Sequence, residues 1–236
     1  MYIIILIFLF ISFSFFIMFN LKSNNIKVLY NINDFKKIKK INGTLENNYI
    51  IIKKEIQKLN NKRLSKIKIN KGDIYFSGDK LAKEINKEDG WTLGYGNKDD
   101  WTQYPIIYKG EFFKNAKNNL PLLCSFLEQY KNCFYTLFIS RMKPNSIIPL
   151  HSDGTKGRSV DNNSSEKERL TYHFYVDCPD DVIMYVKNPN NNKFLKIYHK
   201  NKESCIFDSE FYHEVANNSN EFRTIICAKF YIKASK

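Results

Sequence analysis

The chain has 236 residues, a formal net charge of +13, 43% hydrophobic residues and 15% aromatic residues. This length accommodates one compact domain with an appendage, and the hydrophobic content excludes a wholly disordered protein. Residues 21–72 carry 14 Lys and Arg against three acidic residues, whereas residues 73–236 carry 23 basic and 21 acidic residues. Because most of the chain is nearly neutral, the charge does not favour a nucleic-acid binder, and we expect no nucleic-acid partner.

The first predicted element is a transmembrane anchor over residues 1–20. Residues 2–19 contain no charged side chain, and a helix of that length spans about 27 Å, close to the hydrocarbon thickness of a bilayer. A cleaved signal peptide is the alternative, but the segment lacks a basic start and a small-residue cleavage site. Because lysines follow the segment, the positive-inside rule predicts a single-pass membrane protein with a cytoplasmic catalytic domain; an ER-lumenal domain is the alternative.

Residues 21–72 are predicted to form a polybasic juxtamembrane linker that contains a helix. Residues 21–48 are polar and are interpreted as the linker itself. Residues 49–60 have the spacing of a basic amphipathic helix, and we expect this helix to lie along anionic lipid headgroups. The membrane is therefore a predicted partner, and residues 73–236 form the predicted globular domain.

The globular domain is predicted to be mainly β. Residues 113–130 predict a helix that admits Pro121 in its first turn. After this helix, β-branched and aromatic segments alternate with turn residues, which is typical of a sandwich or barrel rather than of βαβ units. These segments predict strands over residues 133–142, 168–177, 182–187, 194–199, 203–208 and 222–232.

The chain has four histidines, and two of them indicate a metal site. His151 and Asp153 are two residues apart, so in a strand both side chains point to one face. With His213 from a distant strand they would form a two-His, one-carboxylate set, which binds Fe(II) and leaves adjacent coordination positions open. A His-x-Asp pair alone is a weak motif, and a structural role is the alternative. His199, between Tyr198 and Lys200, is interpreted as a surface residue.

Arg223 strengthens the metal-site hypothesis. It follows His213 by ten residues across a turn-like run of Asn and Ser. A hairpin at this run would place the two residues on neighbouring antiparallel strands. A guanidinium in that position could bind a carboxylate of 2-oxoglutarate bidentately while the keto acid end chelates the metal.

At these residues the sequence resembles the aspartyl/asparaginyl β-hydroxylases, a family of Fe(II)/2-oxoglutarate dioxygenases, over residues 98–232. The resemblance rests on Asp100-Trp101-Thr102-Gln103-Tyr104, Asn115 and Pro121, the Ser140 to His151 spacing, Leu170-Thr171-Tyr172-His173, Phe207-Asp208, Phe211-Tyr212-His213-Glu214-Val215 and Phe222-Arg223. It implies a double-stranded β-helix (jelly roll) with flanking N-terminal helices, and Fe(II), 2-oxoglutarate and O2 as cofactor and cosubstrates. By resemblance, His151 and His213 ligate iron, and Ser140, His173 and Arg223 contact 2-oxoglutarate.

The sequence departs from this family at two positions. The animal peptide hydroxylases carry no carboxylate at the position of Asp153, whereas bacterial members that hydroxylate lipid A acyl chains resemble this chain there and also have an N-terminal anchor. A family Arg is replaced by Thr171, and Arg169 is the candidate substitute as a cosubstrate contact.

The resemblance implies an enzyme that hydroxylates an unactivated C–H bond, with an aspartyl/asparaginyl residue of a peptide as the first substrate class. A hydroxylase of membrane-lipid acyl chains is one alternative. A non-catalytic, membrane-tethered jelly-roll binding module is the other. The predicted partners are accordingly a peptide or lipid substrate and the membrane.

Overall fold

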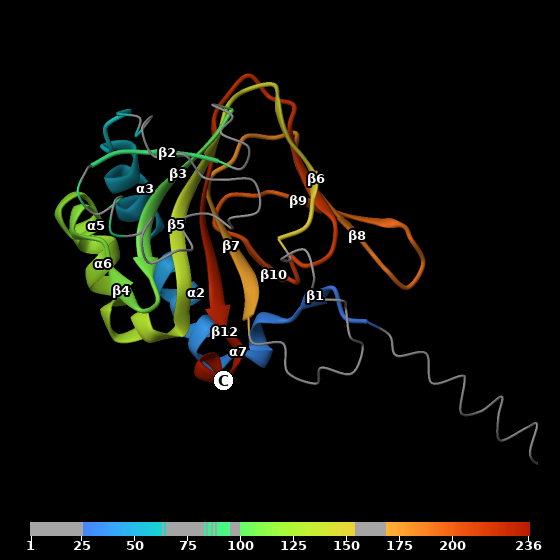
Figure 1. Cartoon of the computed structure of the whole chain (residues 1–236), viewed down its shortest axis with the longest axis horizontal. Helices are drawn as coiled ribbons and strands as arrows, with labels where there is room; N and C mark the ends of the chain where they lie inside the picture. The colour runs from blue at the N-terminus through green and yellow to red at the C-terminus, as the bar shows by residue number, and fades with distance from the viewer. Residues whose placement is uncertain are drawn as a thin grey trace, which may run out of the picture.

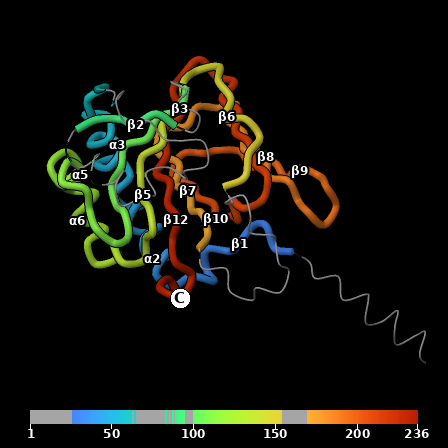
Figure 2. The backbone as a smooth tube through the Cα atoms, in the orientation of Figure 1, coloured from blue at the N-terminus to red at the C-terminus, as the bar shows by residue number. Residues whose placement is uncertain are grey.

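The computed structural model describes residues 26–62, 64, 83, 85, 87, 89–94, 100–153 and 169–236. In this part of the chain two antiparallel sheets face each other, and helices cover the outer side of the larger sheet (Figure 1). The fold is therefore mainly β and antiparallel, which confirms the predicted class and agrees with a jelly-roll architecture. The continuous tube in Figure 2 shows the chain passing back and forth between the two sheets.

The larger sheet has the strand order β1-β10-β7-β12-β5-β3-β2, and β4 pairs with β3. Its strands are β1 (Leu29–Tyr30), β2 (Thr92–Leu93), β3 (Trp101–Tyr108), β4 (Glu111–Phe112), β5 (Phe134–Met142), β7 (Arg169–Asp177), β10 (Ser204–Phe207) and β12 (Arg223–Tyr231). The smaller sheet has the order β6-β11-β8-β9. Its strands are β6 (Ser146–His151), β8 (Val182–Lys187), β9 (Phe194–Tyr198) and β11 (His213–Asn217).

The six strands predicted from Cys133 onward are all present and match within one residue at each end. These are β5, β7, β8, β9, β10 and β12. Strand β3 was not predicted, because all eight of its residues are buried and it shows no alternation of polar and apolar residues.

The described helices pack against the larger sheet and form the main core together with it. They are the 3-10 turns η1 (Ile32–Asp34) and η3 (Glu128–Cys133) and the helices α2 (Lys36–Asn47), α3 (Tyr49–Gln57), α5 (Lys114–Asn119), α6 (Pro121–Leu127) and α7 (Ile232–Ser235). The single helix predicted for residues 113–130 is divided at Leu120 into α5 and α6. Pro121 is the first residue of α6, where its missing N–H and fixed φ are tolerated, whereas inside a helix it would clash with the preceding turn.

The polar linker predicted for residues 21–48 is wrong where α2 lies. Ile38, Ile41 and Leu45 lie at helical spacing on one face of α2 and are buried in the main core against the larger sheet. The abundance of Lys and Asn in this segment hid the apolar face, which occupies only every third or fourth position. The folded unit therefore begins well before residue 73.

The helix predicted for residues 49–60 exists as α3, but it packs on the domain. Ile52 and Ile56 are buried in the main core. Glu55 is 8% exposed, and its two carboxylate oxygens accept hydrogen bonds of 2.9 Å from the backbone N–H groups of Leu122 and Leu123. A carboxylate at the start of α6 satisfies donors that have no partner within that helix, so Glu55 ties α3 to α6.

The predicted membrane anchor over residues 1–20 lies outside the described residues. Among the helices that the structure does describe, none is both long and apolar enough to cross a bilayer.

Candidate functional site

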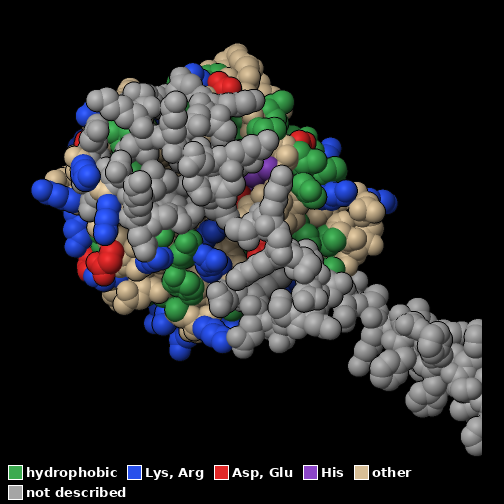
Figure 3. Space-filling model, viewed as in Figure 1, with side chains coloured by type: hydrophobic (Ala, Val, Ile, Leu, Met, Phe, Trp, Pro, Cys, Tyr) green, Lys and Arg blue, Asp and Glu red, His purple; other side chains and the backbone are tan. Residues whose placement is uncertain are grey.

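A cavity between the two sheets contains six of the seven predicted site residues. Strands β3, β5, β7, β10 and β12 contribute from the larger sheet, and β6 and β11 contribute from the smaller one. The described lining consists of Trp101, Ser140, Ile148, His151, Asp153, Thr171, His173, Phe207, His213, Val215, Arg223, Ile225 and Cys227. Histidine atoms, drawn purple, reach the surface at this junction in Figure 3.

The three predicted metal ligands lie together on the side of the smaller sheet. His151 is the last residue of β6 and His213 the first of β11, and the two are register partners with ring centroids 4.3 Å apart. The backbone N–H of Asp153 donates to the carbonyl of Ser209, which fixes the chain just after β6. One ligand atom from each of His151, Asp153 and His213 lies within 4.8 Å of the others, so the three can hold one metal ion.

His151 and His213 both present Nε2 to the place where a metal ion could bind. The Nδ1 atom of His151 lies 2.7 Å from the carbonyl oxygen of Pro149, and that of His213 lies 2.9 Å from the carbonyl oxygen of Phe211. A carbonyl only accepts, so each Nδ1 carries the proton and each Nε2 keeps its lone pair. Metal-ligating histidines are usually oriented by such a hydrogen bond from the other nitrogen.

The protonation states of this group also suit a metal. Burial by itself would raise the pKa of Asp153, but the positive charge of Lys229, with His213 and His151 nearby, holds it well below its usual value. The Nζ atom of Lys229 lies 3.2 Å from Oδ2 of Asp153. Burial lowers the pKa of His213 to about 4. At neutral pH the carboxylate is therefore ionised and the imidazole neutral, as metal binding requires.

Arg223, on the side of the larger sheet, is a buried cation that has no acidic partner among the described residues. It is 1% exposed, its Nε donates to Nδ1 of His199 and its Nη1 donates to Oγ of Ser140, both at 3.3 Å. Its Nη2 has no partner, and no acidic side chain in the described ranges forms an ion pair with it. Burying a charge without a countercharge is costly, so this end of the cavity favours an anionic ligand.

His173 lies near Arg223 on β7. It is 7% exposed, and its Nδ1 atom has no hydrogen-bond partner. Burial, followed by the positive charge of Arg223, lowers its pKa well below the usual value. His173 is therefore neutral and can offer an unpaired ring nitrogen to a ligand in the cavity.

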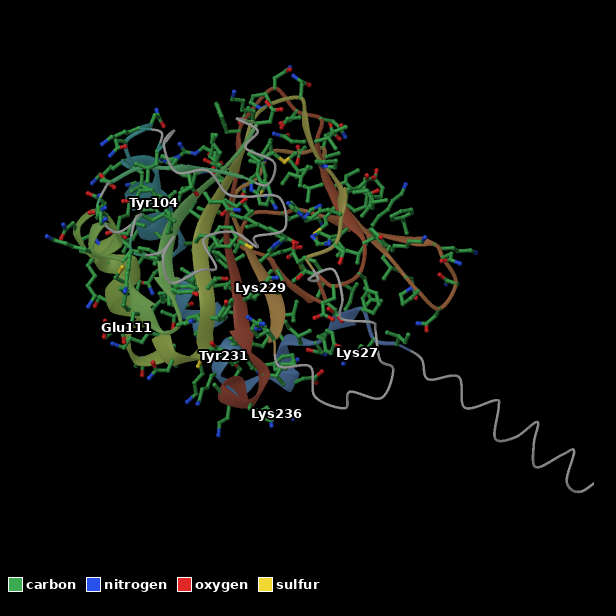
Figure 4. The ribbon with its side chains drawn as sticks, viewed as in Figure 1. Lys27, Tyr104, Glu111, Lys229, Tyr231 and Lys236 are labelled. Carbon is green, nitrogen blue, oxygen red and sulfur yellow. The ribbon has the colours of Figure 1, made fainter. Side chains whose placement is uncertain are left out.

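Two residues of this site were not identified from the sequence. His199 is 4% exposed, not at the surface; its ring stacks on Tyr175 at 4.2 Å between centroids, and it accepts the hydrogen bond from Arg223. Lys229 lies in the middle of the molecule (Figure 4), where it contacts Asp153. Lysine is so common in this chain that it carries little signal. A lysine within the apolar residues 225–231 of β12, however, could have indicated a buried partner.

The structure corrects the prediction for Arg169. Its guanidinium lies over the ring of Tyr135 at 4.1 Å, and it does not line the cavity. Arg169 is the first residue of β7 and pairs with Tyr231, so it lies one same-face position beyond the cavity. Thr171 pairs instead with Lys229 on the neighbouring strand, which puts a positive charge opposite the position where the family carries Arg.

The hairpin predicted between His213 and Arg223 is also wrong. Strand β11 pairs with β6 and β8, whereas β12 pairs with β5 and β7. The run between them carries the chain from one sheet to the other, where the side chain of Asn217 donates to the carbonyls of Lys143 and Glu221. His213 and Arg223 therefore belong to opposite walls of the cavity.

Comparisons with known proteins identify relatives of the chain. A family model described as Aspartyl/Asparaginyl beta-hydroxylase matches residues 46–232. The uncharacterized protein L888 of Acanthamoeba polyphaga mimivirus is 30% identical over 213 residues, which cover 89% of this chain and 72% of that protein.

Two solved structures show a more distant likeness. A 2OG-Fe(II) oxygenase family oxidoreductase from Burkholderia pseudomallei has a TM-score of 0.43 and 14% identity, over 64% of this chain and 75% of that one. A recombinant oxalate oxidase in complex with glycolate has a TM-score of 0.36 and 6% identity, over 59% of this chain and 56% of that one.

Proposed function

The chain belongs to the aspartyl/asparaginyl beta-hydroxylase family, and from this membership and the geometry of the cavity we propose that it is an Fe(II)- and 2-oxoglutarate-dependent dioxygenase. The observation that carries the proposal is the presence, in one cavity, of a group of three potential metal ligands and a buried guanidinium that forms no ion pair within the described residues. When bound, Fe(II) supplies the oxidative chemistry in which O2 and 2-oxoglutarate are consumed, the substrate C–H becomes C–OH, and succinate and CO2 are released.

The residues of the smaller sheet would hold the metal. His151 and His213 offer Nε2, and Asp153 offers one carboxylate oxygen. Because Lys229 contacts Oδ2 of Asp153, Oδ1 is the oxygen on the side of His151, 3.6 Å from its Nε2. Three protein ligands leave positions for the cosubstrates.

Aromatic rings enclose this group from both sides. The ring of Phe207 lies 5.4 Å from that of His213, and the ring of Trp101 lies 6.5 Å from that of His151. Apolar rings at these positions would limit the access of water to bound cosubstrates and strengthen the electrostatic interactions inside the cavity.

The residues of the larger sheet would bind the carboxylate of 2-oxoglutarate that is remote from the metal. Arg223 would donate from Nη2 and Nη1, and Ser140, which already accepts from Trp101 at 2.7 Å, would orient the guanidinium. His199 holds the Nε edge of Arg223, so the remaining donors face the cavity. A charge-assisted pair in this dry site offsets the cost of burying the cation.

The family description favours an aspartyl or asparaginyl side chain of a peptide as the substrate. A lipid acyl chain is the second candidate, favoured by the predicted anchor and by Asp153, a carboxylate that the lipid-hydroxylating branch also carries. Either substrate gains one oxygen atom, so the mass of the product distinguishes hydroxylation from binding alone.

The test uses the full chain, loaded with Fe(II) and 2-oxoglutarate without oxygen and then exposed to O2. We expect succinate release by the native protein and none by the His151→Ala variant. Incubation with peptide and lipid extracts should then yield a one-oxygen mass gain in one of the two. The enzyme hypothesis fails if native protein and variant release succinate equally or not at all, and tight 2-oxoglutarate binding without turnover would indicate a binding module.

A further inference from the structure

The smaller sheet has an outer face that is unusually apolar. Alternation along β6, β8 and β11 turns Ile148, Met184, Val186 and Val215 inward, and the partly buried Leu195 and Ile197 of β9 pack against the same cluster. The opposite side, the outer face, consists of Ile147, Pro149, Ile183, Tyr185, Lys187, Phe194, Lys196, Tyr198, Glu214 and Ala216. An antiparallel sheet with one side on the core normally shows a polar side to water, so the composition of this face requires an explanation.

Large hydrophobic side chains of the outer face are exposed. Ile147 is 60% exposed, Tyr198 56% and Phe194 43%. Lys187 and Lys196 add two positive charges against the single carboxylate of Glu214. Green hydrophobic and blue basic side chains lie side by side on the right of Figure 3, in the region of β8 and β9. Aromatic rings mixed with lysines are typical of surfaces that meet lipid headgroups.

The start of the described chain is tied to this sheet. The backbone N–H of Ile26 donates to Oδ1 of Asn190 at 3.1 Å, and Nδ2 of Asn190 donates to the carbonyl of Ile26 at 2.9 Å. Asn190 lies in the turn between β8 and β9. Figures 1 and 2 show β1, which follows directly, on the same side of the molecule as this hairpin.

This tie limits how far the apolar segment 2–19 can lie from the hairpin. Residue 19 is seven residues before Ile26, and seven fully extended residues span at most about 25 Å. Whatever path the intervening residues follow, the end of the apolar segment lies within that distance of the β8–β9 turn. A bilayer that holds the segment must therefore pass close to the smaller sheet.

We propose that the outer face of the smaller sheet docks on the headgroup surface of an anionic bilayer, with residues 2–19 as the anchor. Phe194, Tyr198 and Ile147 would enter the interface, and the two lysines would attract anionic lipids. This sheet replaces α3 as the membrane-facing element, because the apolar stripe of α3 is already buried in the core. Since β6 and β11 also carry His151 and His213, docking would hold the cavity close to the lipid.

The test compares two reporters of equal exposure in the full chain, inserted into vesicles that contain brominated lipids. Tyr198 is 56% exposed on β9, and Ile50 is 58% exposed on α3, so Tyr198→Trp and Ile50→Trp form a matched pair. Quenching of the native Trp91 and Trp101 is subtracted. We expect about threefold stronger quenching of the Tyr198→Trp reporter, because an interfacial side chain lies within reach of the bromines.

Three results would overturn the proposal. The first is equal quenching of the two reporters, or stronger quenching of Ile50→Trp. The second is failure of the full chain to float with the vesicles. The third is a concentration-dependent emission shift of Tyr198→Trp in detergent without lipid, which would assign the face to a second copy of this chain. Replacing phosphatidylserine by phosphatidylcholine should weaken the quenching, and unchanged far-ultraviolet circular dichroism controls for folding.

Discussion

The two sheets differ in burial, and the two halves of the candidate site follow that difference. Strand β12 of the larger sheet buries eight of its nine residues, because helices cover one face and the smaller sheet covers the other. Strands β8 and β11 of the smaller sheet alternate between buried and partly exposed residues. The candidate metal ligands lie on or next to the half-exposed sheet, whereas Arg223 is the first residue of the almost wholly buried strand β12.

The two halves are also held in place differently. Each histidine of the candidate metal site is oriented by a carbonyl two residues earlier in its own chain segment, although the two histidines meet only through the pairing of β6 with β11. Arg223 is oriented by His199 and Ser140, which are 24 and 83 residues away. The orientation of the two histidine rings therefore follows from local sequence, whereas the orientation of Arg223 depends on packing between distant strands.

Removing one of the candidate metal ligands should have the largest effect, and it should act on the metal half of the site alone. His213→Ala should weaken the binding of Co(II) or Mn(II), measured by calorimetry, by at least about a hundredfold, because losing a direct ligand costs more than losing a residue that only orients one. His173→Ala is the matched control: this histidine is also buried in the cavity, but it lies on the larger sheet. Retained metal affinity in His213→Ala would contradict the ligand assignment.

Arg223→Met tests the anion half. We expect the KM for 2-oxoglutarate to rise by about thirtyfold to a hundredfold, equivalent to about 2–3 kcal/mol for a lost charge-assisted pair. 2-Oxoglutarate should raise the Tm of the native protein but not that of the variant, since a ligand stabilises only a fold that binds it. Arg169→Met, at the guanidinium that lies over Tyr135, should behave as native. Equal effects of the two substitutions would contradict the assignment.

The contact between Lys229 and Asp153 joins the two halves of the site, because Lys229 lies on β12 of the larger sheet and Asp153 belongs to the metal group. The Lys229→Met substitution tests this contact. The pKa of His213 is lowered to about 4, whereas that of Asp153 is held well below its usual value. As the pH falls, His213 therefore takes up a proton before Asp153 does, and metal binding is lost at that step. Lys229 lowers the pKa of His213 as well as that of Asp153. Removing this cation raises both pKa values, and we expect the low-pH limit of metal binding to move up by as much as about one pH unit. Lys229→Arg should keep the native limit. A shift in the opposite direction would show that Lys229 mainly repels the metal.

The smallest expected effect concerns His199. The His199→Phe substitution keeps a ring against Tyr175 but removes the acceptor for Nε of Arg223. We expect the KM for 2-oxoglutarate to rise by about threefold to tenfold, equivalent to one ordinary hydrogen bond of about 0.5–1.5 kcal/mol, because His199 acts on the ligand only by orienting Arg223. Metal affinity should be unchanged. A loss of metal binding together with 2-oxoglutarate binding would instead indicate a general packing role.

Local signals predicted much of the fold and half of the site. The strands after Cys133 were predictable because β-branched residues, aromatic residues and turn residues mark strands locally. His151 and Asp153 were predictable as a pair because residues two positions apart in a strand point to the same face. Arg169 shows the limit of such local signals. The two-residue spacing correctly placed it on the same face of the strand as Thr171, but it could not show that the cavity ends before Arg169.

The sequence by itself determined the β-rich class and the His-x-Asp pair, because both depend on spacing within short segments. The family resemblance then supported His213 as the third candidate metal ligand. Only the tertiary structure decided which sheet each strand joins, that α2 and α3 belong to the domain, and that Lys229 and His199 support the site. Those features depend on register and burial between residues far apart in the chain. A lysine or histidine acquires its role there from a neighbour that no local pattern identifies.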